Sequence, residues 1–217
     1  MEWNELIERY KKVALASVAD ACDSIVGRTC YMSHDMRPRI VEARVVGPAL
    51  TVNETEAVKF GAPQHTLDTI ENAAPGDVLV IGLERENLDV AVMGGLVAAG
   101  CYVKKMAGAI LDSGIRDIPE IREKFGFPIY ARSVSPGTTL GRYLSFESGV
   151  PIVCGGVRVN PGDLIVADID GVVVVPRDKA EEVLLFAEDI DVKEAEQSAC
   201  ILETGSLIKG LAKHNRV

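Results

Sequence analysis

The sequence lacks any apolar run of the roughly 18 residues that a membrane-spanning helix requires. It also lacks the basic start and apolar segment that are typical of a secretion signal, because it opens with the acidic sequence Met1-Glu2-Trp3-Asn4-Glu5. We therefore expect a cytoplasmic protein with no membrane partner.

Cysteine is scarce and widely scattered. The chain has five cysteines, an odd number, and none of them forms a CxxC pair: Cys22, Cys30, Cys101, Cys154 and Cys200. This pattern disfavours both a disulfide framework and a structural zinc site. We predict reduced thiols packed in the core, since a free cysteine packs like a small apolar residue.

Basic residues are fewer than acidic ones. The chain carries 23 basic and 32 acidic residues, which gives a net charge of -9, and no basic run is interleaved with aromatic residues. A surface of this sign repels a phosphate backbone, so direct binding of nucleic acid is disfavoured. The charge leaves open a protein partner that itself handles RNA.

The remaining composition is that of an ordinary globular protein, with 47% apolar and 25% charged residues in 217 positions. No linker or low-complexity segment interrupts the chain, so we expect one domain over residues 1–217. Apolar spacing and turn residues divide it into helices and strands. The predicted helices span 5–27, 65–73, 90–105, 118–125 and 178–204; the predicted strands span 41–52 (interrupted at Gly47-Pro48), 78–81, 107–111, 128–131, 152–154, 157–159, 164–167 and 171–175.

The order of these elements predicts an α/β fold with a mixed sheet. Strands and helices alternate in the middle of the chain, which indicates parallel strands with helices packed on the sheet. The short strands after residue 150 follow one another closely and favour antiparallel pairing. A long helix then ends the fold.

The segment Leu111–Asp117 is the strongest candidate for a site. A buried strand is followed by a predicted turn at 112–114, which presents Arg116 and Asp117 where ligands bind in open α/β sheets. A guanidinium can hold a carboxylate through two hydrogen bonds, and a carboxylate oxygen is a good ligand for Mg²⁺ or Mn²⁺. The alternative is a surface ion pair, with Asp117 capping the following helix.

A second candidate is the glycine turn at Gly94-Gly95-Leu96, before a predicted helix. Backbone amides at a helix start have no helical partners and lie at the positive end of the helix dipole, so they can bind an anion. The alternative is a turn without a binding role.

Several motifs occur in order over about residues 15–200. Together they resemble the motifs of the 4-hydroxy-4-methyl-2-oxoglutarate/4-carboxy-4-hydroxy-2-oxoadipate aldolase family. This family includes a second branch, whose members are similar to the protein called regulator of ribonuclease activity A. The motifs are Arg44–Ala49, Pro75–Val80, Gly94-Gly95-Leu96, Gly108–Asp117, Tyr130–Arg132, Gly155–Asp163 and Ala167–Pro176.

This resemblance implies a layered α/β/β sandwich of the swivelling type that assembles as trimers or hexamers with sites at subunit boundaries. It also implies a class II lyase that uses Mg²⁺ or Mn²⁺ and passes through the enolate of pyruvate. Arg116 would then bind the oxo-acid substrate and offset enolate charge, Asp117 would hold the metal, and the amides of Gly94, Gly95 and Leu96 would bind the pyruvate carboxylate.

The sequence departs from the family at one position. The aldolases carry an acidic residue where this chain has Gly95, whereas the ribonuclease-regulator branch lacks that acid and tends to lose the aspartate kept here as Asp117. The resemblance also makes Glu194 a second-shell candidate, supplied across a subunit boundary. We expect aldol cleavage of a short 4-hydroxy-2-oxo diacid or decarboxylation of oxaloacetate; the alternative is a non-catalytic regulator that binds a ribonuclease or another protein.

Overall fold

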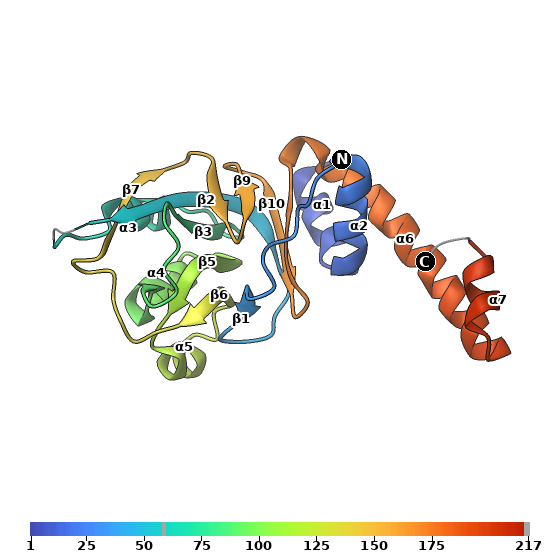
Figure 1. The fold of residues 1–217 in the computed structure, drawn as a ribbon. Coiled ribbons are helices and arrows are strands. Elements are labelled where there is room, and N and C mark those ends of the chain that lie inside the picture. The colour runs from blue at the N-terminus through green and yellow to red at the C-terminus, as the bar shows by residue number, and fades with distance from the viewer. Residues whose placement is uncertain (58–59, 215–217) are drawn as a thin grey trace.

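The computed structural model describes residues 1–57 and 60–214 and consists of a mixed sheet with helices at two sides (Figure 1). The helices are α1 (Trp3–Tyr10), α2 (Leu15–Ile25), α3 (Gln64–Glu71), α4 (Gly95–Val103), α5 (Ile118–Lys124), the short 3₁₀ helix η1 (Arg177–Lys179), α6 (Ala180–Thr204) and α7 (Leu207–Ala212). The strands are β1 (Arg37–Pro38), β2 (Val45–Glu56), β3 (Val78–Leu83), β4 (Ala91–Met93), β5 (Gly108–Ile115), β6 (Ile129–Val134), β7 (Tyr143–Ser148), β8 (Ile152–Cys154), β9 (Val157–Val159), β10 (Leu164–Asp168) and β11 (Gly171–Val175).

The main sheet has the strand order β1-β6-β5-β3-β2-β10-β11, with β4 beside β5 and β7 beside β2. Its central strands β2, β3, β5 and β6 are parallel, as the alternation of strands and helices predicts. The later strands are antiparallel: β10 pairs with β2 and β11, and β8 pairs with β9 as a separate hairpin. The predicted change from parallel to antiparallel pairing is confirmed.

Both faces of the central sheet are covered, which explains the continuous apolar sequence of β3. Leu79 and Ile81 face the cluster that α3, α4 and α5 complete, whereas Val78 and Val80 face the cluster that contains the β8–β9 hairpin. A parallel strand buried on both sides is typically apolar throughout. The helix, sheet and hairpin layers confirm the predicted α/β/β arrangement.

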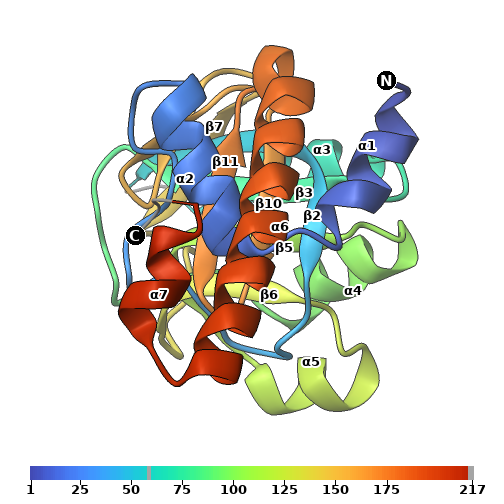
Figure 2. The ribbon, with the colours of Figure 1, turned by 90° about the vertical axis from the view of Figure 1, so that its right-hand side faces the viewer.

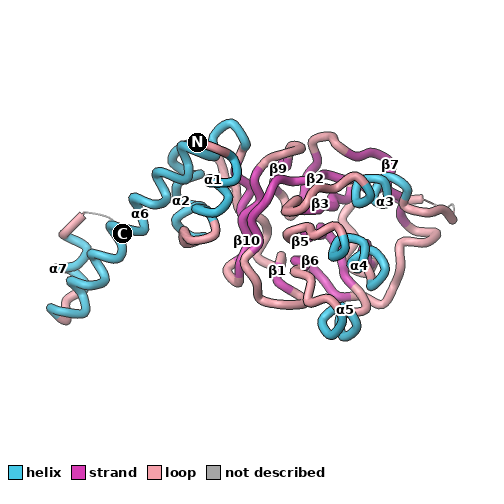
Figure 3. The backbone as a smooth tube through the Cα atoms, turned by 180° about the vertical axis from the view of Figure 1, so that it is seen from behind, coloured by secondary structure: helices cyan, strands magenta, loops and turns pink. Residues whose placement is uncertain are grey.

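A second group of helices packs beyond β10 and β11. Figure 2 shows α1, α2 and α6 in front of these strands, and Figure 3 shows them at the end of the molecule away from α3, α4 and α5. Residues from the first half of α6 are buried against α1 and α2: Ala180, Val183, Leu184, Ala187 and Ile190. The second half of α6 projects from the body together with α7. No helix among the described residues is both long and apolar enough to cross a membrane.

The predicted helix over 5–27 is wrong, because the chain folds there into two helices with a turn between them. Tertiary contacts fix this turn: Val13 is buried, and the amide of Ala14 donates a 3.0 Å hydrogen bond to Oδ2 of Asp191 on α6. Apolar spacing alone does not reveal such a partner.

The predicted turn at 112–114 is also wrong, since β5 continues to Ile115. Polar residues fit within this buried strand because their side chains find partners. Ser113 Oγ donates to the Val90 carbonyl at 2.6 Å, and Asp112 Oδ1 accepts a 2.9 Å hydrogen bond from the amide of Gly155.

Further differences lie in elements that the sequence analysis did not separate. The predicted helix over 90–105 begins with strand β4, and both β7 and α7 were not predicted. The predicted break at Gly47-Pro48 does not occur, because β2 runs through it; a Cβ on Gly47 would lie only 2.1 Å from the carbonyl oxygen of Gly76. The predicted core thiols are confirmed for four of the five cysteines; none of the five is in a disulfide, and Cys200 is partly exposed.

Candidate active site

The two candidate segments meet because β4 and β5 are parallel neighbours. Ala91 pairs with Gly114 and Met93 with Ile115, so both strands end at the same edge of the sheet. The amide of Arg116 donates a 3.1 Å hydrogen bond to the Met93 carbonyl. The glycine turn after β4 is therefore held directly beside the Arg116-Asp117 pair.

The position of these segments depends on a row of serine hydroxyls. Serines of β5 and β6, and the serine directly after β6, donate hydrogen bonds to carbonyl groups of the loop before β4. Ser113 donates to Asn87 and Val90, Ser133 to Leu88, and Ser135 to Asp89. These contacts fix the loop, and through it the start of α4, against the sheet.

Asp117 has a left-handed backbone, with φ of 61°, which is uncommon for residues other than glycine. Its Oδ2 accepts a 2.9 Å hydrogen bond from the amide of Gly95 and lies 3.6 Å from Arg116 Nε. Asp117 makes no side-chain cap of α5. Of the alternative reading, the ion pair with Arg116 is present, whereas the side-chain cap of α5 is not, because the carboxylate is turned toward α4.

Gly94 and Gly95 are needed for this close approach. A Cβ on Gly94 would lie 2.7 Å from Asp117 Oδ2 and 2.9 Å from Arg116 Nε. A Cβ on Gly95 would lie 3.1 Å from Glu120 Oε2 and 3.7 Å from Asp117 Oδ2. The glycine pair therefore leaves room for the charged side chains beside it.

The site is open at the surface of the single chain. The side chains of Arg116 and Asp117 are each 40% exposed, and Leu96 is 93% exposed. The first amides of α4 have no carbonyl partner within the helix and lie at its positive end. A guanidinium and a helix start therefore face the same open space, an arrangement suited to a small carboxylate.

Glu120 is a site residue that the sequence analysis missed. It lies in the first turn of α5, three positions after Asp117, and Lys124 Nζ binds its Oε1 at 2.8 Å. The spacing Asp-x-x-Glu at the start of a predicted helix is the signal that could have identified it.

The donor set fits a hard divalent cation that keeps much of its water shell. Within residues 1–57 and 60–214, no group of three or more histidine, cysteine or carboxylate side chains is arranged to hold a metal. Asp117 offers Oδ1, which accepts no hydrogen bond from the described residues. Mg²⁺ is commonly held by one or two carboxylates together with water and substrate, and Mn²⁺ accepts the same ligands.

Glu194 does not join this site within one chain. It lies in the second half of α6, which projects from the end of the molecule opposite α4 and α5 (Figure 1). Its role as a residue supplied across a subunit boundary stays a prediction.

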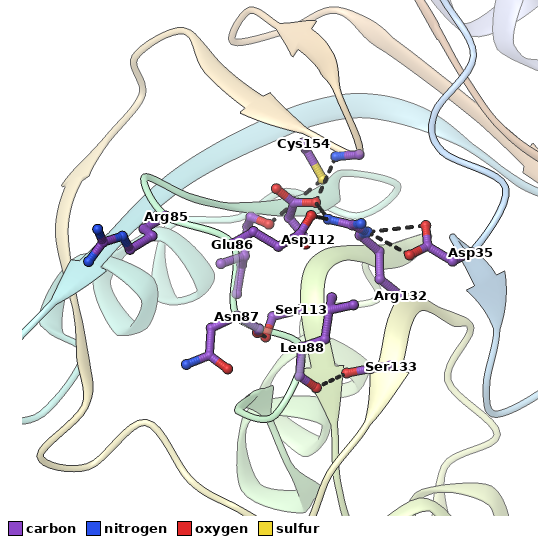
Figure 4. A network of polar contacts seen from close by, with 12 residues as sticks. Asp35, Arg85, Glu86, Asn87, Leu88, Asp112, Ser113, Arg132, Ser133 and Cys154 are labelled. Carbon is purple, nitrogen blue, oxygen red and sulfur yellow. Dashed lines mark hydrogen bonds and ion pairs between the residues drawn. The ribbon is translucent and has the colours of Figure 1, made fainter.

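A second polar cluster is centred on the mostly buried side chain of Arg132. Arg132 on β6 binds three carboxylates, with Nε 3.0 Å from Asp35 and Nη1 at 2.6 Å from Glu86 and 3.3 Å from Asp112 (Figure 4). Only 12% of the Arg132 side chain is exposed. Burial raises the pKa of Asp112, while the amide of Gly155 and Arg132 favour its charged form.

Glu54 on β2 is the most completely buried carboxyl group among the described residues, with 1% of its surface exposed. Its Oε2 and the nearby Thr66 Oγ1 have no hydrogen-bond partner in the described part of the chain. Burial raises the pKa of Glu54 to about 7. The sequence analysis did not identify Glu54, because no motif or spacing distinguishes it from other residues of a strand.

Comparison with known proteins shows which family this chain is similar to. A sequence model of the family described as RraA-like, Aldolase/RraA, matches residues 15–174. A relative from Halalkalibacterium halodurans, named "Putative 4-hydroxy-4-methyl-2-oxoglutarate aldolase", is 34% identical over 85% of this chain and 82% of its own length. The 4-hydroxy-4-methyl-2-oxoglutarate aldolase of Thermus thermophilus is 31% identical over 49% of this chain and 63% of its own.

Solved structures give the same fold. The crystal structure of Streptomyces coelicolor RraAS2, described as an unusual member of the RNase ES inhibitor RraA protein family, superposes with a TM-score of 0.78. It is 28% identical and covers 89% of this chain and 96% of that one.

Proposed function

Since the chain belongs to the RraA-like family, we propose that it is a lyase acting on small 2-oxo acids through the enolate of pyruvate. The reaction is aldol cleavage of a short 4-hydroxy-2-oxo diacid, decarboxylation of oxaloacetate, or both. The observation that carries the proposal is the convergence of Arg116, Asp117 and the start of α4 at one edge of the sheet. Relatives named as aldolases support it.

Arg116 has the central electrostatic role in this proposal. Breaking the carbon–carbon bond leaves negative charge on the former ketone oxygen, and a donor aimed at that oxygen lowers the barrier. A guanidinium presents several N–H groups in one plane and stays charged. The amides of Gly94, Gly95 and Leu96 are assigned to the pyruvate carboxylate; the Gly95 amide already binds Asp117, so the next amides of α4 carry most of this task.

Asp117 is the proposed ligand for Mg²⁺ or Mn²⁺, through the oxygen that Gly95 does not occupy. When bound, the cation supplies Lewis-acid stabilisation of the enolate oxygen. The Gly95 amide fixes the carboxylate in place, and Arg116 Nε lies 3.6 Å from the same oxygen, Oδ2, which leaves Oδ1 open. Asp117 thus connects the anion-binding helix start to the cation site.

We further propose that the active form is a homotrimer or hexamer with sites at subunit boundaries. Leu96 is almost fully exposed next to the site, and Val103 and Val134 are also mostly exposed. A neighbouring subunit that covered these apolar side chains would enclose the site and bring a second acid, with Glu194 as the candidate.

A non-catalytic regulator is the alternative function. Its support is the similarity to RraAS2, together with the glycine at position 95 in place of an acid. The intact Arg116-Asp117 pair opposes it. A regulator of this kind would inhibit a purified endoribonuclease at stoichiometric concentration, and Arg116→Ala would leave that inhibition intact.

Release of pyruvate from oxaloacetate, coupled to lactate dehydrogenase, tests the lyase proposal. We expect turnover with Mg²⁺ or Mn²⁺, none above background with a chelator, and a loss of about 100-fold or more in Arg116→Ala. Arg85→Ala is the matched control, because Arg85 is a surface arginine with a 77% exposed side chain. Turnover no faster than that of the metal ion alone would reject the lyase and favour the regulator.

A further inference from the structure

The carboxylate of Glu120 fills the space beside Gly95 at the start of α4. Glu120 Oε2 lies 3.1 Å, and its Cδ 3.4 Å, from the point where a Cβ on residue 95 would stand. Asp117 Oδ2 lies 3.7 Å from the same point. Two carboxylates from the start of α5 therefore converge on one residue of α4, and a larger residue at 95 would press on Glu120.

The two carboxylates are differently engaged. Asp117 Oδ2 accepts the Gly95 amide and contacts Arg116, so its charge is already balanced by donors. Glu120 binds Lys124 through Oε1, while Oε2 has no hydrogen-bond donor among the described residues and is turned toward Gly95. Asp117 Oδ1 also has no donor among the described residues, but it is assigned to the cation, so Glu120 Oε2 is the carboxylate oxygen that remains to accept a proton.

The proposed aldol cleavage requires such an acceptor, because the substrate hydroxyl must lose its proton as the carbon–carbon bond breaks. Decarboxylation of oxaloacetate has no such proton: carbon dioxide leaves and its bonding electrons enter the enolate. Both reactions need stabilisation of the enolate, but only aldol cleavage needs the base. A residue that serves as base is therefore revealed by comparing the two reactions.

We propose that Glu120 is the base of aldol cleavage, taking the C4-hydroxyl proton of a 4-hydroxy-2-oxo acid directly or through one water. The C3–C4 bond then breaks, its electron pair enters the pyruvate enolate, and C4 leaves as a carbonyl. The enolate is protonated at C3 to give pyruvate, and Glu120 returns its proton to solvent. This inference rests on the proposed lyase function.

The test measures both reactions in the full-length protein, with 4-hydroxy-4-methyl-2-oxoglutarate and with oxaloacetate. We expect Glu120→Gln to lower kcat/KM for aldol cleavage by about 100-fold or more, as for loss of a general base, and to lower decarboxylation only severalfold. Glu123→Gln is the matched control, since Glu123 is an exposed glutamate on the same helix. Arg116→Ala should lower both reactions strongly.

The pH profile separates proton transfer from a structural role. A general base gives kcat/KM for aldol cleavage an acid limb in wild type, and this limb should be absent from the residual activity of Glu120→Gln. A Glu120→Gln variant that keeps aldol cleavage, or that loses both reactions in equal proportion, overturns the assignment. A wild-type protein that catalyses neither reaction overturns the lyase proposal itself, and the base with it.

The shared space beside Gly95 provides a second test. In Glu120→Ala the space is empty, so the additional change Gly95→Asp should return a carboxylate to it without a clash. We expect the double variant to recover part of the aldol cleavage that Glu120→Ala loses. A folded double variant no more active in aldol cleavage than Glu120→Ala would overturn the location assigned to the proton acceptor.

Discussion

The amide of Gly95 and the carboxylate of Asp117 are joined by a 2.9 Å hydrogen bond across 22 positions of the sequence. This contact ties the first residue of α4 to the second residue after β5. Asp117 makes this contact from a left-handed backbone, with φ of 61°. One hydrogen bond thus connects the strained residue, the helix start and the proposed cation site.

Asp117→Asn should remove the proposed cation site with little change to the fold. Asparagine tolerates the left-handed conformation and can still accept the Gly95 amide, but its neutral oxygen is a weaker ligand. We expect Mn²⁺ affinity, measured by electron paramagnetic resonance of the free ion, to fall about 10-fold or more. Asp178→Asn, at an exposed position, is the control; equal Mn²⁺ affinity in Asp117→Asn and wild type would reject Asp117 as the ligand.

The backbone of Asp117 gives a stability test that is independent of activity. A left-handed residue costs about 1–2 kcal/mol when it carries a Cβ and much less for glycine. Asp117→Gly should therefore unfold at a higher urea concentration than Asp117→Ala, by a difference of about 1 kcal/mol in the free energy of unfolding. Identical urea midpoints for the two variants would show that the strain is relieved elsewhere.

Glu54 should make the protein less stable as the pH rises from about 4.5 to about 7. Its pKa is raised to about 7 in the folded state and is near 4.5 when the chain is unfolded, so the folded state alone keeps the proton in this interval. The stabilising effect is complete below 4.5 and is lost as the pH passes 7, by up to about 3 kcal/mol.

Glu54→Gln should remove most of this dependence and should be more stable than wild type at pH 8. Urea unfolding at several pH values measures both effects. Asp112, whose pKa is also raised, leaves a smaller slope of the same sign in the variant. Equal slopes in the two proteins would contradict the role of Glu54.

Arg132→Ala should destabilise the protein by about 3–5 kcal/mol, because it leaves the buried charge of Asp112 without its cationic partner. The double variant Arg132→Ala/Asp112→Ala removes that unpaired charge and should recover part of the loss. Free energies of unfolding in urea for the two single variants and the double variant provide the comparison. Purely additive losses would show that the two residues are not coupled.

Much of the fold could be predicted because the relevant signals are local. The strands at 152–154, 157–159 and 171–175 match the prediction residue for residue, since short apolar runs there are bounded by glycine and proline turns. The course of β5 through Asp112, Ser113 and Gly114 could not be predicted. Its polar residues are satisfied by Val90 and Gly155, which are distant in sequence.

The candidate site was predicted in part for the same reason. Arg116, Asp117 and the glycine turn were identified from motifs, and the structure brings them together through the β4–β5 pairing. The pairing itself was missed, because β4 has only three residues and precedes a helix of similar composition. Glu120 was missed because its position beside Gly95 depends on the packing of α5 against α4, which the sequence does not show.

The pairing of β2 with β10 has a consequence for how the chain folds as it is made. Residues 45–48 pair with residues 164–167, so the edge of β2 cannot be completed until most of the chain has left the ribosome. At a synthesis rate of about 5–20 residues per second, the time between the synthesis of β2 and that of β10 is on the order of ten seconds. Through this interval one edge of β2 presents unpaired backbone groups, which can act as a template for pairing with another chain.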